Sequence, residues 1–169
     1  MTQSTSAARS VQPIPAGYHS VTPALTVRGA AQAIEFYTRA FGARELGRMP
    51  APDGQHIVHA ELQIGDARLM LADEFPEMGG RAPEALGGTP VSLHLYVEDA
   101  DAVVQRAVEA GATVIQPLMD AFWGDRYGRL KDPFGHEWSV ATHVEDVSED
   151  EMRRRAEAFA AQFANQTAQ

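Results

Sequence analysis

Apolar and polar residues alternate in short segments of the chain, which is the pattern of strands that bury one face. Residues 20–27 alternate in this way, with three side chains predicted on the core face: Val21, Leu25 and Val27. Residues 56–64 alternate more regularly, with four side chains predicted on the core face: Val58, Ala60, Leu62 and Ile64. Between them, apolar residues recur at helical spacing from about residue 30, and Gly42 stands where a helix C-cap is expected.

This order of predicted elements occurs twice. The first module has two further strands, at 44–49 and 67–72. The second module comprises a strand, a helix and three strands, at 91–97, 99–111, 113–119, 127–130 and 136–142. Val27 and Val97 are separated by 70 positions, as are Gly65 and Gly135. Because one such module cannot bury its core face alone, we predict an α+β fold in which two βαβββ modules pair.

Three segments lie outside the two modules. Residues 1–17, rich in Ser, Thr, Gln, Ala and Pro, predict a flexible N-terminal arm. Residues 74–90, rich in Gly and Pro, predict a linker or a surface lid. Residues 144–169 predict a C-terminal amphipathic helix and tail, packed on its own domain or at a dimer contact. The domain between arm and helix has the bounds 18–143, with module one at 18–73 and module two at 91–143.

The sequence KDPFGHEW at 131–138 predicts a tight hairpin. Asp132 can accept a hydrogen bond from the backbone two residues further on, and Pro133 fixes φ near the value a turn requires. Gly135 supplies a positive φ that residues with a Cβ resist. We therefore predict structural roles for Asp132 and for His136.

Composition narrows the classes of function. The chain has 23 acidic and 14 basic residues and a formal charge of −9, which opposes binding to nucleic acid or to an anionic membrane. It has no cysteine, which excludes thiol catalysis and thiolate metal sites. The sequence also has no apolar run near the roughly 20 residues that cross a bilayer. We expect a soluble, cytoplasmic protein.

The two modules, a V-x-x-A-x-x-F-Y-x-x-x-F-G-type first helix at 27–42 and the late DPFG hairpin resemble the vicinal oxygen chelate superfamily, the glyoxalase and bleomycin-resistance group. The stretch WGDRYG at 123–128 further resembles the PhnB-like branch. The resemblance covers about 18–143. It implies a curved mixed sheet whose strands surround a cavity, with helices on the convex faces. Enzymes of this group hold a divalent metal at the bottom of that cavity.

The resemblance also implies which positions would hold the metal. They lie on the first and last strands of each module and are occupied here by Thr22, Met70, Ser92 and Ser139. Divalent ions in such sites need carboxylate or imidazole ligands, whereas these side chains offer hydroxyls and a thioether. We therefore predict no metal and no other cofactor, and we count the four residues among those that contact a ligand.

Other polar residues are predicted to face the same cavity: His59, Glu61, His94, Tyr96 and Glu137. His59, Glu61 and His94 are candidates for a displaced metal site or for acid–base catalysis, because histidine titrates near neutral pH and a carboxylate can orient it. The alternative is a polar lining in which they bond to one another or to arginine.

Trp123 and Tyr127, close to Arg126, predict a rim that would hold a flat polar ligand. The aromatic rings offer area for burial, and the arginine would pair with an anionic group. The alternative is that these aromatic residues belong to the core.

Three functions are open at this point. The first is a metal-free protein that binds a planar or aromatic compound, as a homodimer with the ligand at the subunit junction, as drug-binding members of the resembled family do. The second is a lyase, isomerase or dioxygenase that uses His59, Glu61 and His94, with or without a relocated metal. The third is a module without a ligand. We favour the first.

Overall fold

The computed structural model describes residues 11–167 of the chain, and the side chains of residues 11–162. Module one contains β1 (Ala24–Val27), α1 (Ala30–Phe41), β2 (Arg44–Pro50), β3 (Ile57–Ile64) and β4 (Ala67–Asp73). A short 3-10 turn, η1 (Pro76–Met78), and one helical turn, α2 (Pro83–Leu86), lie in the linker. Module two contains β5 (Ser92–Tyr96), α3 (Ala100–Glu109), β6 (Thr113–Asp120), β7 (Asp125–Lys131) and β8 (Glu137–His143), followed by α4 (Glu149–Thr167).

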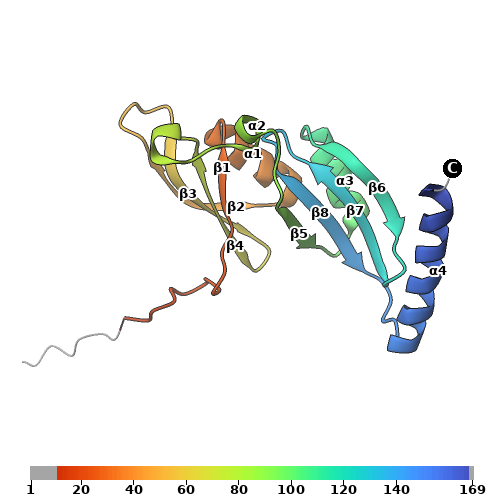
Figure 1. Cartoon of the computed structure of the whole chain (residues 1–169). Coiled ribbons are helices and arrows are strands. Elements are labelled where there is room, and N and C mark those ends of the chain that lie inside the picture. Colours follow the sequence, from red (N-terminus) through yellow and green to blue (C-terminus); the bar gives the residue numbers. More distant parts are fainter. Residues whose placement is uncertain (1–10, 168–169) are drawn as a thin grey trace, which may run out of the picture.

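Each module forms its own four-stranded mixed sheet. The strand orders are β1-β4-β3-β2 and β5-β8-β7-β6, so the two sheets have the same topology. In both sheets the first and last strands of the module are parallel and the remaining pairs are antiparallel. Figure 1 shows the sheets side by side, with α1 and α3 on the same side of them and α4 at the far end of module two. The predicted α+β fold with two βαβββ modules and a C-terminal helix is confirmed.

The alternation predicted for the first strands is wrong at two places. Val21 is 82% exposed because β1 begins only at Ala24. In β3, Ile57 is buried and Val58 is exposed, the reverse of the prediction. The pairing of β2 with β3 shifts register here and leaves Val58 unpaired. Such a bulge interrupts the alternation of the strand, so that Ile57, on the other side of it, faces the core instead of Val58.

Helix α1 is fixed at both ends by the residues around it. Gly42 has the left-handed conformation of a C-cap, as predicted. At the other end the Asp73 carboxylate accepts hydrogen bonds from the backbone N–H groups of Gly29 (2.8 Å) and Ala30 (2.9 Å). Module two achieves the same result with the hydroxyl of Thr142, which accepts from the Ala100 N–H at 2.8 Å. A side chain at the end of the last strand therefore holds the helix start in both modules.

The two modules share one core, and the predicted hairpin joins them. Aromatic residues of α1 pack on Trp138 of β8, whose ring lies 5.4 Å from Tyr37 and 4.6 Å from Phe41. The buried Asp132 carboxylate accepts hydrogen bonds from the Tyr37 hydroxyl (2.7 Å) and the Trp138 indole (2.9 Å). Burial, and then the Asp132 charge, raise the pKa of Tyr37 well above its usual value. His136 adds a second link, with Nε2 at 3.0 Å from the Thr26 carbonyl oxygen.

A substitution at Gly135 can test the geometry of this hairpin. Its φ is +89°, and a Cβ added to it would lie 2.9 Å from Pro83 Cβ in α2. We expect Gly135→Ala to lower the free energy of unfolding by about 2 kcal/mol, because backbone strain and a steric clash add. Gly54→Ala is the matched control, since Gly54 has a φ of +69° but no atom within 4 Å of the added Cβ. Urea denaturation should show a loss of only about 1 kcal/mol there; equal losses at the two sites would contradict the clash.

The C-terminal helix packs on its own module through its first half. The Ser148 hydroxyl accepts from the Glu151 N–H at 3.4 Å, at the start of the helix. Phe159 packs on Phe122 with ring centroids 5.2 Å apart, and Arg155 bonds to Glu145. In the part of the chain that is described, no helix is both long enough and apolar enough to cross a membrane.

Candidate functional site

Each sheet has one face covered by helices and one that we call its open face. In module two, strand register places the following side chains together on the open face: Ser92, His94, Tyr96, Tyr127, Arg129, Glu137, Ser139 and His143. In module one the open face contains Ala24, His59, Glu61, Arg68 and Met70. These two faces contain most of the residues that the sequence predicts to contact a ligand.

A buried carboxylate organises one end of the module-two open face. Asp125 is only 2% exposed, and it accepts hydrogen bonds from the Trp123 indole (2.9 Å) and the Tyr96 hydroxyl (2.9 Å). His143 Nδ1 lies 2.8 Å from its other oxygen. Burial acts to raise the pKa of Asp125, but the hydrogen bonds from His143, Tyr96 and Trp123 outweigh it and hold that pKa below its usual value. The hydrogen bond to Asp125 raises the pKa of Tyr96.

Aromatic rings form a continuous row across this face. The His94 ring lies 4.5 Å from Tyr96 and stacks at 6.1 Å on Tyr127, with an angle of 18° between the planes. Tyr127 in turn contacts Trp123 edge to face at 5.3 Å. The orientation of His94 is fixed by its Nδ1, which lies 2.7 Å from the Ser139 hydroxyl. The row presents apolar area with a few fixed polar atoms, which is the usual composition of a small-molecule site.

The module-one open face has a smaller polar group. His59 Nε2 lies 3.3 Å from Glu61 Oε1. The pKa of Glu61 is lowered by a hydrogen bond from the Tyr18 hydroxyl and then by His59. Arg68 lies over the Tyr18 ring and donates to the Gly17 carbonyl oxygen at 3.3 Å. The described part of the N-terminal arm therefore lies against this face, over a cleft of about 490 Å³ that Glu61 and Met70 line.

The four positions that the resemblance assigns to metal ligands, Thr22, Met70, Ser92 and Ser139, have side chains that do not fit a divalent ion. Met70 is paired with Ala24 across β1 and β4, and Ser139 is paired with His94 across β5 and β8. Ser92 begins β5, whereas Thr22 lies before β1 and not on it, and both offer only a hydroxyl group. A thioether and neutral hydroxyls are poor ligands for such an ion.

The structure does not bring His59, Glu61 and His94 together. The first two lie on the sheet of module one, whereas His94 lies on the sheet of module two and bonds to Ser139. Among the residues described, no three histidine or acidic side chains are grouped as metal ligands. The catalytic or metal cluster that the sequence suggested is therefore not formed within one chain.

The structure places Arg126 away from the predicted aromatic rim. Arg126 follows Asp125 in β7 and so points to the opposite face of the sheet. There it bonds to Asp101 of α3 (2.9 and 3.0 Å) and to Asp120 (3.4 Å). The arginine of the open face is Arg129, which is paired with Glu137 at 2.5 Å.

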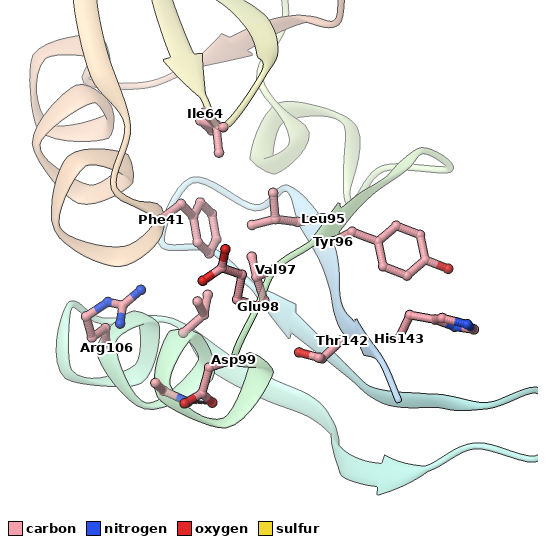
Figure 2. A pocket seen from close by; sticks show the side chains of 13 residues that line it. Phe41, Ile64, Leu95, Tyr96, Val97, Glu98, Asp99, Arg106, Thr142 and His143 are labelled. Carbon is pink, nitrogen blue, oxygen red and sulfur yellow. Dashed lines mark hydrogen bonds between the residues drawn. The ribbon is translucent and has the colours of Figure 1, made fainter. Parts of the chain in front are cut away.

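Another cleft lies between the modules on the helix side. It has a volume of about 910 Å³ and is lined by Phe41 and Ile64 of module one and by residues of β5 and α3. Figure 2 shows that Tyr96 and His143 point away from Phe41 and Arg106, toward the open face. Tyr96 is the one predicted ligand-contacting residue among those that line this cleft.

Sequence reasoning missed Asp125 and His143 as parts of the site. Neither residue is among those that the sequence predicts to contact a ligand. The signal was present in the alternation of β7, because Asp125 and Tyr127 are two residues apart and must share a face. The hydrogen bonds to Tyr96 and His143 depend on the pairing of three strands, which no local pattern gives.

Comparison with known proteins identifies the class to which this fold and site belong. The family model described as Glyoxalase/Bleomycin resistance protein/Dioxygenase superfamily matches residues 18–140. The chain therefore belongs to this superfamily, as the repeated modules and the hairpin had indicated.

Individual proteins are also similar to this chain in sequence or in fold. The uncharacterized protein Rv0887c of Mycobacterium tuberculosis is 52% identical over 137 residues, which cover 79% of this chain and 80% of that protein. The crystal structure of TioX from Micromonospora sp. ML1 is similar with a TM-score of 0.59 and 33% identity, covering 73% of this chain and 97% of TioX. A PhnB protein from Bacillus cereus shares the fold, with a TM-score of 0.56 and 18% identity over 73% of this chain and 99% of that chain.

Proposed function

We propose that this protein binds a planar or aromatic small molecule on the open face of module two, without a metal. The observation that carries the proposal is the row of rings from Tyr96 through His94 and Tyr127 to Trp123. Three of these rings are held by hydrogen bonds to Asp125 or Ser139, so little side-chain freedom would be lost on binding. A flat ring stacked on His94 and Tyr127 would bury apolar area on both partners.

We further propose that the site is completed by a second copy of the chain. Large apolar side chains remain exposed on both open faces, including Tyr96 at 61% and Met49 at 59%. Placing module one of one copy over module two of another would cover both faces. It would also bring His59 and Glu61 of one chain toward His94 of the other, which the single chain does not do.

The test compares a planar ring with a saturated ring of the same skeleton. We expect quinoline to shift backbone and indole NMR signals of the module-two open face, and decahydroquinoline to shift them far less, because only the planar ring can stack. Tyr127→Ala should weaken quinoline binding about fivefold, which corresponds to the roughly 1 kcal/mol of an aromatic pair. Val108→Ala, an exposed change on α3, is the matched control and should leave the affinity unchanged.

Sedimentation in the same samples tests the dimer. We expect a dimer at the concentrations at which quinoline binds, and signals of module one that shift together with those of module two. Equal binding of the planar and saturated rings, or shifts confined to the cleft around Phe41 and Arg106, would refute the proposed site. A monomer that binds quinoline as well as the dimer does would refute the proposal that two chains share the site. It would not refute the proposed site on module two.

A further inference from the structure

Asp125 holds its three partners in different ways. Trp123 and Tyr96 donate to one carboxylate oxygen, Oδ2, and both side chains belong to the aromatic row. His143 occupies the other oxygen, Oδ1. The second nitrogen of His143, Nε2, lies 3.0 Å from Oδ1 of Asp146, in the segment that leads to α4. The imidazole thus connects the ring-holding carboxylate to the C-terminal segment.

Other contacts fasten the same segment to the turn that carries Trp123. The Gly124 carbonyl oxygen accepts a hydrogen bond from the Glu145 N–H at 3.0 Å. Glu145 is paired with Arg155 of α4 through two bonds of 2.7 and 2.8 Å. Phe122, on the other side of Trp123, packs edge to face on the Trp123 ring at 5.1 Å and lies against Phe159. Helix α4 contacts Phe122, and the segment that leads to α4 contacts Gly124, so together they contact residues on both sides of Trp123.

We infer that Asp125 is a positioning residue of the ligand-binding face, and that His143 makes its hold on Trp123 and Tyr96 dependent on the C-terminal segment and on pH. This inference rests on the proposed function in one respect, namely that the aromatic row is where the ligand binds. The hydrogen-bond network of Asp125 and His143 belongs to the free protein and can be tested without a ligand.

The pH dependence follows from the donors that an imidazole can supply. Asp125 of β7 and Asp146 of the following loop both face His143, and Tyr96 of β5 shares the Asp125 carboxylate. A protonated ring donates to both aspartates, whereas a neutral ring donates to only one of them. The bonds to Asp146 and then to Asp125 raise the pKa of His143 above 6.5. His143 therefore donates to both aspartates at pH values below the ordinary histidine pKa. One of these two hydrogen bonds is lost as the pH rises through the raised pKa of His143.

The test follows the indole N–H signals of Trp123 and Trp138 in the full-length protein from about pH 5.5 to about pH 8.5, which brackets a raised histidine pKa. We expect the Trp123 signal to shift with the same midpoint as the His143 ring, and the Trp138 signal to stay in place. His143→Gln should abolish the step. Asp146→Asn should lower its midpoint, whereas Asp150→Asn, an exposed change in α4 away from His143, should not.

Quinoline affinity provides the second readout. We expect the affinity to weaken about threefold as the pH rises through the pKa of His143, which corresponds to less than 1 kcal/mol. In His143→Gln the affinity should be independent of pH. Asp125→Asn keeps an acceptor for the indole but lacks the charge, so the affinity should again lose its pH step. A Trp123 signal that does not titrate, or that titrates unchanged in His143→Gln, would overturn the inference. If the signal behaves as expected but quinoline does not bind, the positioning network stands and the proposed function fails.

Discussion

Replacing Asp132 by alanine is expected to lower the free energy of unfolding by about 4 kcal/mol, since two buried donors would each lose an acceptor at about 2 kcal/mol apiece. These donors are the Tyr37 hydroxyl and the Trp138 indole, both fully or almost fully buried. The same carboxylate also accepts from the backbone N–H groups of Phe134 and His136, both at 2.9 Å. The change would thus damage the hairpin and the contact between modules together.

Urea denaturation monitored by circular dichroism measures this loss. Asp66→Ala is the matched control, because Asp66 is an exposed aspartate in the turn between β3 and β4, and its removal should change stability by less than about 0.5 kcal/mol. Tyr37→Phe in the Asp132→Ala background should then cost less than it does alone, because the hydroxyl no longer has its acceptor. Strictly additive losses would show that the carboxylate and the hydroxyl do not act as a pair.

Gly124→Ala is expected to cost about 3 kcal/mol, from a positive φ and an unavoidable clash with backbone. Gly124 has a φ of +99°, and an added Cβ would lie 2.2 Å from the Glu145 carbonyl oxygen. Backbone cannot move aside as a flexible side chain does, so the segment after β8 would have to separate from the Trp123 turn. We therefore expect α4 to be released as well as the protein to be destabilised.

Limited proteolysis with trypsin measures the release, since three consecutive arginines, Arg153, Arg154 and Arg155, lie in α4. Cleavage there should be about tenfold faster in Gly124→Ala, which corresponds to about 1.4 kcal/mol of local unfolding. Gly47→Ala is the control, because a Cβ at Gly47 meets no atom within 4 Å. Unchanged cleavage in Gly124→Ala would mean that α4 is held independently of this turn.

The repeat was readable from the sequence because each of its signals is local. Alternation gave the strands to within a few residues, and Gly42 marked a helix end that the structure confirms. The two errors in β1 and β3 have one origin. Alternation assumes an unbroken strand, and neither the late start of β1 nor the bulge near Val58 leaves a mark on the apolar pattern.

The site was predictable only in part. His94, Tyr96 and Ser139 were placed on the correct face, because parity within one strand fixes the face. The same rule places Arg126 on the opposite face, because it follows Asp125 in β7, although it is close to Trp123 in the sequence. Asp125 was missed as an acceptor because its partners Tyr96 and His143 come from two other strands.

By itself, the sequence determined the duplicated module and the hairpin at Asp132 and Gly135. These features depend on residue type and on spacing within single elements. The tertiary structure alone decided that Asp132 joins the two modules, that Asp125 gathers Trp123, Tyr96 and His143, and that the C-terminal helix is fastened to the same turn. Those contacts link residues far apart in the chain, and only the packing of strands and helices brings their donors and acceptors within bonding distance.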